Sequence, residues 1–247
     1  MKLALVTGGG RGIGRATSLL LAQKGYQVGV NYHQNAAAAE EVVALIQQQG
    51  GQAFAIQADI ADEQQVVAMF EQIDLQPGRL AALVNNAGIL FQQATVEQLT
   101  AERINRVFAT NVTGCFICCR EAVKRMGHHH GGQGGAIVNV SSGAARSGSP
   151  GEYVDYAASK GAMDTLTKGL SLEVAAQGIR VNGVRPGVIY TEMHADGGEP
   201  GRVDRVGPTL PMQRGGQPEE VANAILWLLS DEASFVTGSY IDATGGR

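Results

Sequence analysis

The chain has 247 residues and a formal net charge of −4 at pH 7. This length is enough for a large buried core within one α/β domain. The charges are scattered singly, which excludes the basic footprint of a nucleic-acid-binding protein and the polybasic patch of a membrane-surface protein, so we expect the partners to be small molecules or further copies of the chain.

The first apolar run, residues 1–6, ends in glycines. It is too short for the hydrophobic region of a signal peptide, and no run in the chain reaches the length of a transmembrane helix. The sequence therefore predicts a cytoplasmic protein without a membrane partner.

Apolar runs alternate with amphipathic stretches, which predicts βαβ units wound into a parallel sheet. Seven strands are expected, at residues 3–6, 27–31, 53–56, 80–85, 136–140, 180–184 and 240–242. Helical patterns lie between them, at residues 12–24, 36–49, 63–73, about 101–126, 153–176 and 219–229. No repeat or linker divides the chain, so residues 1–247 are expected to form a single doubly wound α/β domain of the Rossmann type.

A glycine-rich turn, Thr7-Gly8-Gly9-Gly10-Arg11-Gly12-Ile13-Gly14, joins the first predicted strand to the first predicted helix. The strict G-x-G-x-x-G spacing does not occur in it. Glycines nevertheless let a pyrophosphate approach the backbone, and the start of the helix offers free N–H groups to an anion. A turn without a ligand is the alternative, and it is disfavoured because so many glycines raise the entropic cost of folding.

The cysteines Cys115, Cys118 and Cys119 fall within one predicted helix, without a second cluster to complete a disulfide framework or a metal site. They are expected to be small buried hydrophobic residues. Residues 128–130 are three adjacent histidines in a glycine-rich loop, and a solvated loop is favoured over a zinc site. We expect no metal centre.

Tyr156 and Lys160 are four positions apart on a predicted helix and therefore share one face. An ammonium beside a phenol is expected to lower the pKa of the phenol from about 10 toward neutral pH, which would make Tyr156 a usable proton donor and acceptor. This pair alone occurs by chance on many helices. Here Ser141 and Ser142 also follow an apolar strand at residues 136–140.

Together these motifs resemble the short-chain dehydrogenase/reductase family over essentially the whole chain. The family's Thr-Gly-x-x-x-Gly-x-Gly turn and its Asn-Asn-Ala-Gly strand end are matched by Thr7, Gly8, Gly12, Gly14, Asn85, Asn86, Ala87 and Gly88. Within the family the chain resembles bacterial 3-oxoacyl-carrier-protein reductases, glucose 1-dehydrogenase-like enzymes and, most closely, an uncharacterised bacterial oxidoreductase group. One departure is visible: 14 positions separate Ser142 from Tyr156, one more than is usual.

The resemblance implies a catalytic set of Asn111, Ser142, Tyr156 and Lys160. Tyr156 would exchange a proton with the substrate oxygen, and Ser142 would hydrogen-bond that oxygen. Lys160 would keep Tyr156 poised and hold the nicotinamide ribose, while Asn111 would fix a water that connects Lys160 to solvent. For Asn111 alone, a helix asparagine that bonds a neighbouring backbone group is the alternative, and it is favoured when this residue is considered by itself. Ser141 is expected to face away from the site because strand side chains alternate.

The resemblance also implies the cofactor contacts. They are Gly8, Arg11, Gly12, Ile13, Gly14, Asn31, Asp59, Ile60, Asn86, Ala87, Gly88, Tyr156, Lys160, Pro186, Gly187, Ile189 and Thr191. Asn31, at the end of the second strand, stands where NAD enzymes usually place an acid. Arg11 matches the basic residue that faces the 2′-phosphate of NADP. NADP(H) is therefore the expected cofactor, with NAD(H) possible. A solvated turn arginine is the alternative for Arg11, and a helix N-cap is the alternative for Asp59.

Residues 188–218 are expected to form a flap over the substrate, with Glu192, His194 and Arg202 either as polar contacts or as solvated side chains. No basic docking face for an acidic carrier protein is visible around Lys124 and Arg125. Three interpretations stay open: a reductase or dehydrogenase of a small free carbonyl, sugar or polyol, which is favoured; a 3-oxoacyl-carrier-protein reductase; and a non-catalytic dinucleotide-binding regulator. The resemblance further implies a homotetramer.

Overall fold

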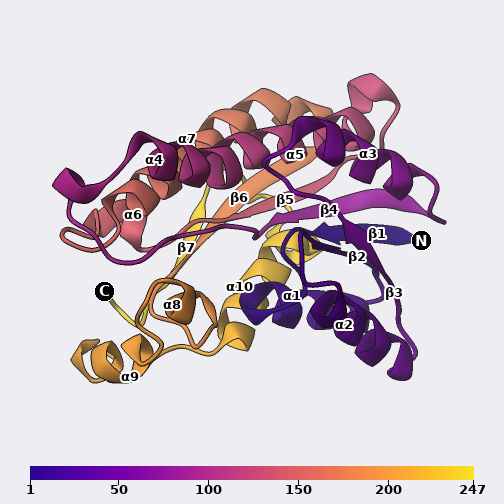
Figure 1. Cartoon of the computed structure of the whole chain (residues 1–247). Helices are drawn as coiled ribbons and strands as arrows, with labels where there is room; N and C mark the ends of the chain where they lie inside the picture. Colours follow the sequence, from indigo (N-terminus) through magenta and orange to yellow (C-terminus); the bar gives the residue numbers. More distant parts are fainter.

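Seven parallel strands form one sheet in the order β3-β2-β1-β4-β5-β6-β7 in a computed structural model that describes residues 1–247 (Figure 1). The strands are β1 (Lys2–Val6), β2 (Gln27–Tyr32), β3 (Gln52–Gln57), β4 (Arg79–Asn85), β5 (Gly135–Val140), β6 (Ile179–Pro186) and β7 (Tyr240–Ala243). The predicted seven-stranded parallel sheet is confirmed. The strand order reverses between β1 and β4, and ligands of such sheets bind beyond the carboxyl ends of the strands at this point.

Helices cover both faces of the sheet (Figure 1). One face carries α1 (Gly12–Gln23), α2 (Ala36–Gln48) and α10 (Pro218–Leu229), and the other carries α3 (Glu63–Asp74), α4 (Ala101–Phe108), α5 (Cys115–Met126) and α7 (Val154–Val174). Each face has its own apolar core, of 19 and 23 buried residues respectively. None of the helices is both long and apolar enough to cross a bilayer.

The helix predicted at residues 101–126 is interrupted by a π-helical segment, Ala109–Gly114, between α4 and α5. A Cβ on Gly114 would stand 2.5 Å from the carbonyl oxygen of Ile60, so the helix passes too close to the segment after β3 for any side chain at this position. The buried residues of this segment are Asn111 and Gly114, so it adds no buried apolar side chain to the helical pattern. Sequence periodicity therefore does not reveal the widened turn, which carries Asn111.

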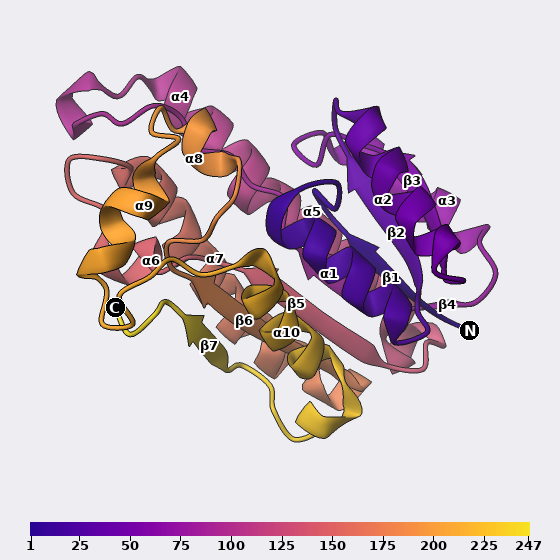
Figure 2. The same ribbon diagram turned by 90° about the horizontal axis from the view of Figure 1, so that it is seen from below.

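Residues 188–218, the predicted flap, contain two short helices, α8 (Met193–Asp196) and α9 (Arg202–Val206), and Figure 2 shows them together at the end of the molecule opposite the N-terminus. Polar contacts attach this segment to the residues that precede α7. Arg202 makes two bonds to the carboxylate of Glu152, at 2.9 and 2.6 Å, and the hydroxyl of Tyr153 donates to the carbonyl of Gly197 at 3.2 Å. Arg202 is thus a structural residue of the flap.

The remaining helical turns are short. They comprise α6 (Ala144–Ser147) and the 3₁₀ turns Val96–Gln98, His128–His130, Ala175–Gln177, Gly207–Thr209 and Asp231–Ala233. The loop between Ser142 and Tyr156 forms α6 and then turns through Gly148, Ser149 and Gly151, all with positive φ. The three cysteines are buried as predicted, the three histidines are exposed, and no group of three or more His, Cys, Asp or Glu side chains is arranged to hold a metal ion.

Candidate active site

The glycine-rich turn is hydrogen-bonded to the residues that follow β4. The side-chain amide of Asn86 donates to the carbonyls of Thr7 and Gly8, each at 3.0 Å, and the hydroxyl of Thr7 accepts from the N–H of Ala87 at 3.0 Å. Gly8 and Gly12 have φ of 61° and 50°, a conformation that favours glycine. A Cβ on Gly14 would stand 2.2 Å from the carbonyl oxygen of Gly8. Gly14 therefore serves the packing of the turn and does not line the cavity above it.

A cavity of about 560 Å³ opens beyond the carboxyl ends of β1, β2, β3 and β4. Eleven of the predicted cofactor contacts line it: Gly8, Arg11, Gly12, Ile13, Asn31, Asp59, Ile60, Asn86, Ala87, Gly88 and Thr191. Its walls also contain residues that the sequence did not single out as cofactor contacts, namely Gly10, Tyr32, His33, Gln34, Asn35, Ala38, Ala58, Ala61, Ile89, Arg106, Ala109, Thr110, Glu192 and Met193.

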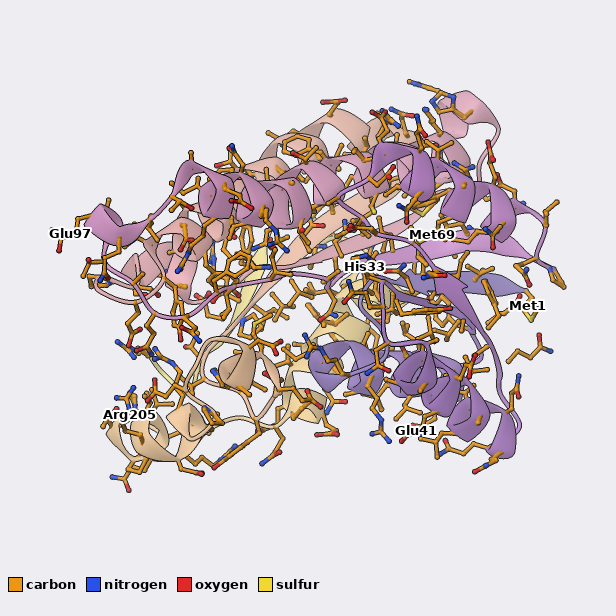
Figure 3. The ribbon with its side chains drawn as sticks, viewed as in Figure 1. Met1, His33, Glu41, Met69, Glu97 and Arg205 are labelled. Carbon is orange, nitrogen blue, oxygen red and sulfur yellow. The ribbon has the colours of Figure 1, made fainter.

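Part of the cavity wall could have been identified from the sequence, because some of its residues directly follow a predicted strand. Residues 32–35 end β2 and follow it, next to the point where the strand order reverses. In Figure 3 His33 lies at the level of the sheet, between the helices above and below it. Arg106 and Thr110 come from α4 and the π-helical segment, and only the path of the folded chain brings them to the cavity.

The side-chain amide of Asn31 is used in hydrogen bonds within the protein. Its side chain is 2% exposed, its oxygen accepts from the N–H of Gly8 at 3.2 Å, and its amide donates to the carbonyl of Ala58 at 3.1 Å. A further donation reaches the carbonyl of Ile56 at 3.3 Å. Asn31 therefore joins the glycine-rich turn to the end of β3, and Tyr32, the next residue, also lines the cavity.

Arg11 and Asp59 have partners within the protein. Nη2 of Arg11 lies 2.8 Å from a carboxylate oxygen of Asp196 in the flap, so Arg11 is not simply a solvated turn residue. Asp59 accepts from the N–H of Ala61 at 2.9 Å and lies 3.6 Å from Nε2 of His33. The N-cap of α3 is Asp62, so the alternative assignment of Asp59 as a helix cap is wrong.

Pro186, Gly187 and Ile189 do not line the cavity but connect β6 to Thr191. A Cβ on Gly187 would stand 2.7 Å from Cα of Thr244, and Ile189 pairs with Gly216. These contacts direct the chain toward the glycine-rich turn. His194 is bonded through Nε2 to the carbonyl of Ile189 at 2.9 Å and thereby stabilises the same segment.

Tyr156 and Lys160 project from α7 and are almost fully buried, at 8% and 2% exposure. Nζ of Lys160 donates to the carbonyl of Val140 at 2.8 Å and lies 5.6 Å from the centre of the Tyr156 ring. Ser142 follows β5 and its hydroxyl accepts from the N–H of Ala144 at 3.1 Å. Ser141 faces away, as expected from strand alternation, and donates to the backbone carbonyl of Lys160.

Asn111 links the π-helical segment to both of its neighbours. Its oxygen accepts from the N–H of Ile89 at 2.8 Å, and its amide donates to the carbonyl of Ile89 at 2.9 Å and to the hydroxyl of Ser159 at 3.0 Å. Two of these three bonds go to the backbone of Ile89, which agrees with the alternative in which Asn111 bonds a neighbouring backbone group, although Ile89 lies 22 positions away in the sequence.

Gly88 connects this group to the cavity. A Cβ on Gly88 would stand 3.4 Å from Oδ1 of Asn111 and 3.4 Å from Nζ of Lys160, and Gly88 itself lines the cavity wall. The structure therefore brings the side chains of Asn111 and Lys160 to the backbone of the cavity wall, with Tyr156 beside Lys160 and Ser142 beside Tyr156.

The ionisation of the pair differs from the sequence expectation. Burial raises the pKa of Tyr156 to about 12, although an interaction with the Ser142 side chain lowers it. Burial also lowers the pKa of Lys160 to about 8. The prediction that Lys160 lowers the pKa of Tyr156 is wrong here, because the loss of hydration dominates and the amine is directed to Val140. At neutral pH the phenol keeps its proton, which suits it to donate one.

Comparisons with known proteins agree with this geometry. A family model described as Enoyl-(Acyl carrier protein) reductase matches residues 8–247. The chain is 76% identical, over the full length of both proteins, to an uncharacterized oxidoreductase, YgfF, of Escherichia coli. It is 39% identical to the 3-oxoacyl-[acyl-carrier-protein] reductase FabG of Staphylococcus aureus, with 99% of this chain and 97% of that protein covered.

The name of a third relative indicates a different class of substrate. Glucose 1-dehydrogenase 2 of Bacillus subtilis is 36% identical, with 99% of this chain and 94% of that protein covered. Matches of this extent, together with the sheet, the glycine-rich turn and the buried Tyr156–Lys160 pair, establish the family. The chain belongs to the short-chain dehydrogenase/reductase family and is an NAD(P)-dependent oxidoreductase that acts on CH–OH or carbonyl groups.

Proposed function

We propose that this enzyme transfers a hydride between NADP(H) and a small free carbonyl compound or secondary alcohol, such as a sugar, a polyol or a ketone. The observation that carries the proposal is the junction at Gly88, where Lys160 and Asn111 approach the backbone that also lines the dinucleotide-sized cavity. Proton-transfer groups and a nucleotide cavity that meet at one point are what a hydride-transfer enzyme needs, and a non-catalytic regulator needs only the cavity.

The residues present fit a dinucleotide. The backbone at Gly8 and Gly12 is free of side chains, and α1 offers free N–H groups to a pyrophosphate. When bound, the nicotinamide supplies or accepts the hydride. Tyr156 would then give its proton to the substrate oxygen, and Ser142 would stabilise charge on that oxygen. Lys160 would hold the nicotinamide ribose, and Asn111 would maintain the path by which Lys160 exchanges protons with solvent.

The charges on α5 support a free substrate over a carrier-bound one. Lys124 lies 2.9 Å from a carboxylate oxygen of Glu121, and Arg125 makes two 2.7 Å bonds to Asp74. Cations that are already paired with acids offer little attraction to an acidic carrier protein. Reduction of a 3-oxoacyl chain on a carrier protein is the second candidate function, favoured by the name of the Staphylococcus aureus relative.

Steady-state kinetics with both substrate classes test the choice between them. We expect kcat/KM for a simple ketone or sugar to exceed that for a carrier-bound 3-oxoacyl group, and the activity on the carrier-bound substrate to be insensitive to salt. Electrostatic docking is screened by salt. A much higher kcat/KM for the carrier-bound substrate than for its free analogue, falling steeply with added salt, would reveal a basic docking face and favour the second function.

NADP(H) should be preferred over NAD(H) by about ten- to a hundredfold, because a hydrogen bond to a charged group contributes about 1.5–3 kcal/mol. Arg11 lines the cavity, and no acid stands at Tyr32 or His33 to repel a 2′-phosphate. Tyr32→Asp should reduce or reverse the preference, measured as the ratio of kcat/KM for NADPH and NADH. A wild-type enzyme that favours NADH would contradict the assignment.

Asn31→Asp places the same carboxylate one residue earlier, and its expected effect on stability differs from that of Tyr32→Asp. A carboxylate at position 31 would be buried and could no longer donate to the carbonyls of Ala58 and Ile56. We therefore expect it to lower the melting temperature more than Tyr32→Asp does, because Tyr32 is only partly buried, where it packs against the core at the cavity wall.

The assembly that we propose is a homotetramer. Phe116 on α5 and Leu172 on α7 expose 49% and 69% of their surface, which leaves apolar side chains on the two long helices of one face. Such helices can pair across a two-fold axis. Light scattering at micromolar concentration should give four times the mass of one chain, and a monomer would contradict the proposal.

A further inference from the structure

The flap is docked on the glycine-rich turn through one ion pair. Nη2 of Arg11 and a carboxylate oxygen of Asp196, the last residue of α8, are 2.8 Å apart although 185 positions separate the two residues in the chain. The side chains are 52% and 48% exposed. A Cβ on Gly12 would stand 3.1 Å from the Thr191 methyl group, so the flap also contacts the turn beside this ion pair.

The three basic side chains of the cavity wall, Arg11, His33 and Arg106, have different partners. His33 lies beside Asp59, within the segments that follow β2 and β3, and Arg106 stacks on Phe91 with its guanidinium carbon 5.3 Å from the ring centre. Neither of these contacts involves α8. Of these three basic side chains, only Arg11 contacts α8, so an anion that binds the Arg11 guanidinium competes with a contact between the flap and the glycine-rich turn.

We propose that Asp196 is a specificity-determining residue: its carboxylate holds the Arg11 guanidinium in the free enzyme, and the 2′-phosphate of NADP(H) must compete with it for that cation. The proposal rests on the cofactor assignment made above for Arg11. It adds that α8 weakens the binding of NADP(H) and leaves the binding of NAD(H), which has no 2′-phosphate, unaffected.

The physical reason is that both anions need the same donors. A guanidinium binds a carboxylate or a phosphate through its planar fork of N–H groups, and a fork turned toward α8 presents fewer donors to the cavity. If both anions approached Arg11 together, their negative charges would repel each other. A half-exposed ion pair contributes little stability, so the competition should lower affinity modestly and should not prevent binding.

Equilibrium titrations of NADPH and NADH, followed by nucleotide fluorescence, test this competition in the full-length enzyme. Asp196→Asn keeps the size of the side chain and removes its charge. We expect it to tighten NADPH binding by about 1.5- to fivefold and to change NADH binding by less than that. Asp204→Asn is the matched control, because Asp204 lies in the same flap and its carboxylate accepts from the Tyr190 hydroxyl at 2.8 Å. It should change the affinity for neither nucleotide.

The Arg11→Ala variant and the double variant separate the two proposals. Arg11→Ala should weaken the binding of NADPH and not that of NADH. Adding Asp196→Asn to Arg11→Ala should then leave the affinity for NADPH unchanged. If Arg11→Ala leaves the NADPH-to-NADH affinity ratio unchanged, the cofactor assignment fails, and the competition fails with it. If Arg11→Ala weakens NADPH but Asp196→Asn leaves it unchanged or weakens it too, the cofactor assignment stands and the competition is overturned. Weakening by Asp196→Asn would mean that Asp196 holds Arg11 in place for the phosphate.

Discussion

Tyr156→Phe is expected to lower kcat by about 10²- to 10⁴-fold, the range that general acid–base catalysis commonly contributes. The substitution removes only the phenolic oxygen from a buried ring, so the fold and the cavity walls should be kept. Because burial raises the pKa of Tyr156 to about 12, the wild-type phenol is protonated at neutral pH and can donate its proton in the reduction direction, where the loss is measured. The affinity for NADPH should change by less than the rate does.

Single-turnover and steady-state kinetics with NADPH and an accepted ketone measure this effect. Tyr153→Phe is the matched control, since it removes a hydroxyl from a neighbouring buried tyrosine that donates only to the carbonyl of Gly197 in the flap. It should have a much smaller effect on kcat. A Tyr156→Phe enzyme with nearly wild-type kcat would refute the assignment of Tyr156 as the proton donor.

Lys160→Met is expected to abolish most turnover and yet to stabilise the folded enzyme at pH 7. Burial lowers the pKa of Lys160 to about 8, so the charged form is disfavoured in the folded state. The difference from the ordinary value corresponds to at most about 3 kcal/mol of unfolding free energy. Loss of the bond to the Val140 carbonyl offsets about 1 kcal/mol of this. The net gain should raise the melting temperature by several degrees.

The sign of the pH dependence follows from proton uptake. Between pH 8 and about pH 10.4 the unfolded chain binds a proton at Lys160 that the folded chain does not, so wild-type stability gains from this group as the pH rises. The loss of folding stability caused by the buried charge of Lys160 is fully present below pH 8. The advantage of Lys160→Met should therefore shrink as the pH rises through this window. Thermal unfolding at several pH values measures it, with the exposed Lys168→Met as control. A Lys160→Met enzyme that is less stable at every pH would contradict the expectation.

Local patterns in the sequence were enough to predict the fold and much of the site. Apolar runs and amphipathic stretches depend on neighbouring residues, and they predicted all seven strands of the sheet. The glycines of the first turn and the spacing of Tyr156 and Lys160 are also local signals. They led to the residues that line one cavity and to those that meet beside it at Gly88.

The tertiary structure decided how these groups are used, because that depends on residues far apart in the chain. Asn31 was predicted as a cofactor contact, and it lines the cavity, but its side-chain amide is also bonded to backbone at residues 8, 56 and 58. Asn111 lies in a π-helical turn, whereas the sequence predicted one continuous helix over residues 101–126. Burial, which no single segment determines, sets the pKa of Tyr156 and Lys160. The pairing of Arg11 with Asp196 exists only because the flap returns to the first turn of the fold.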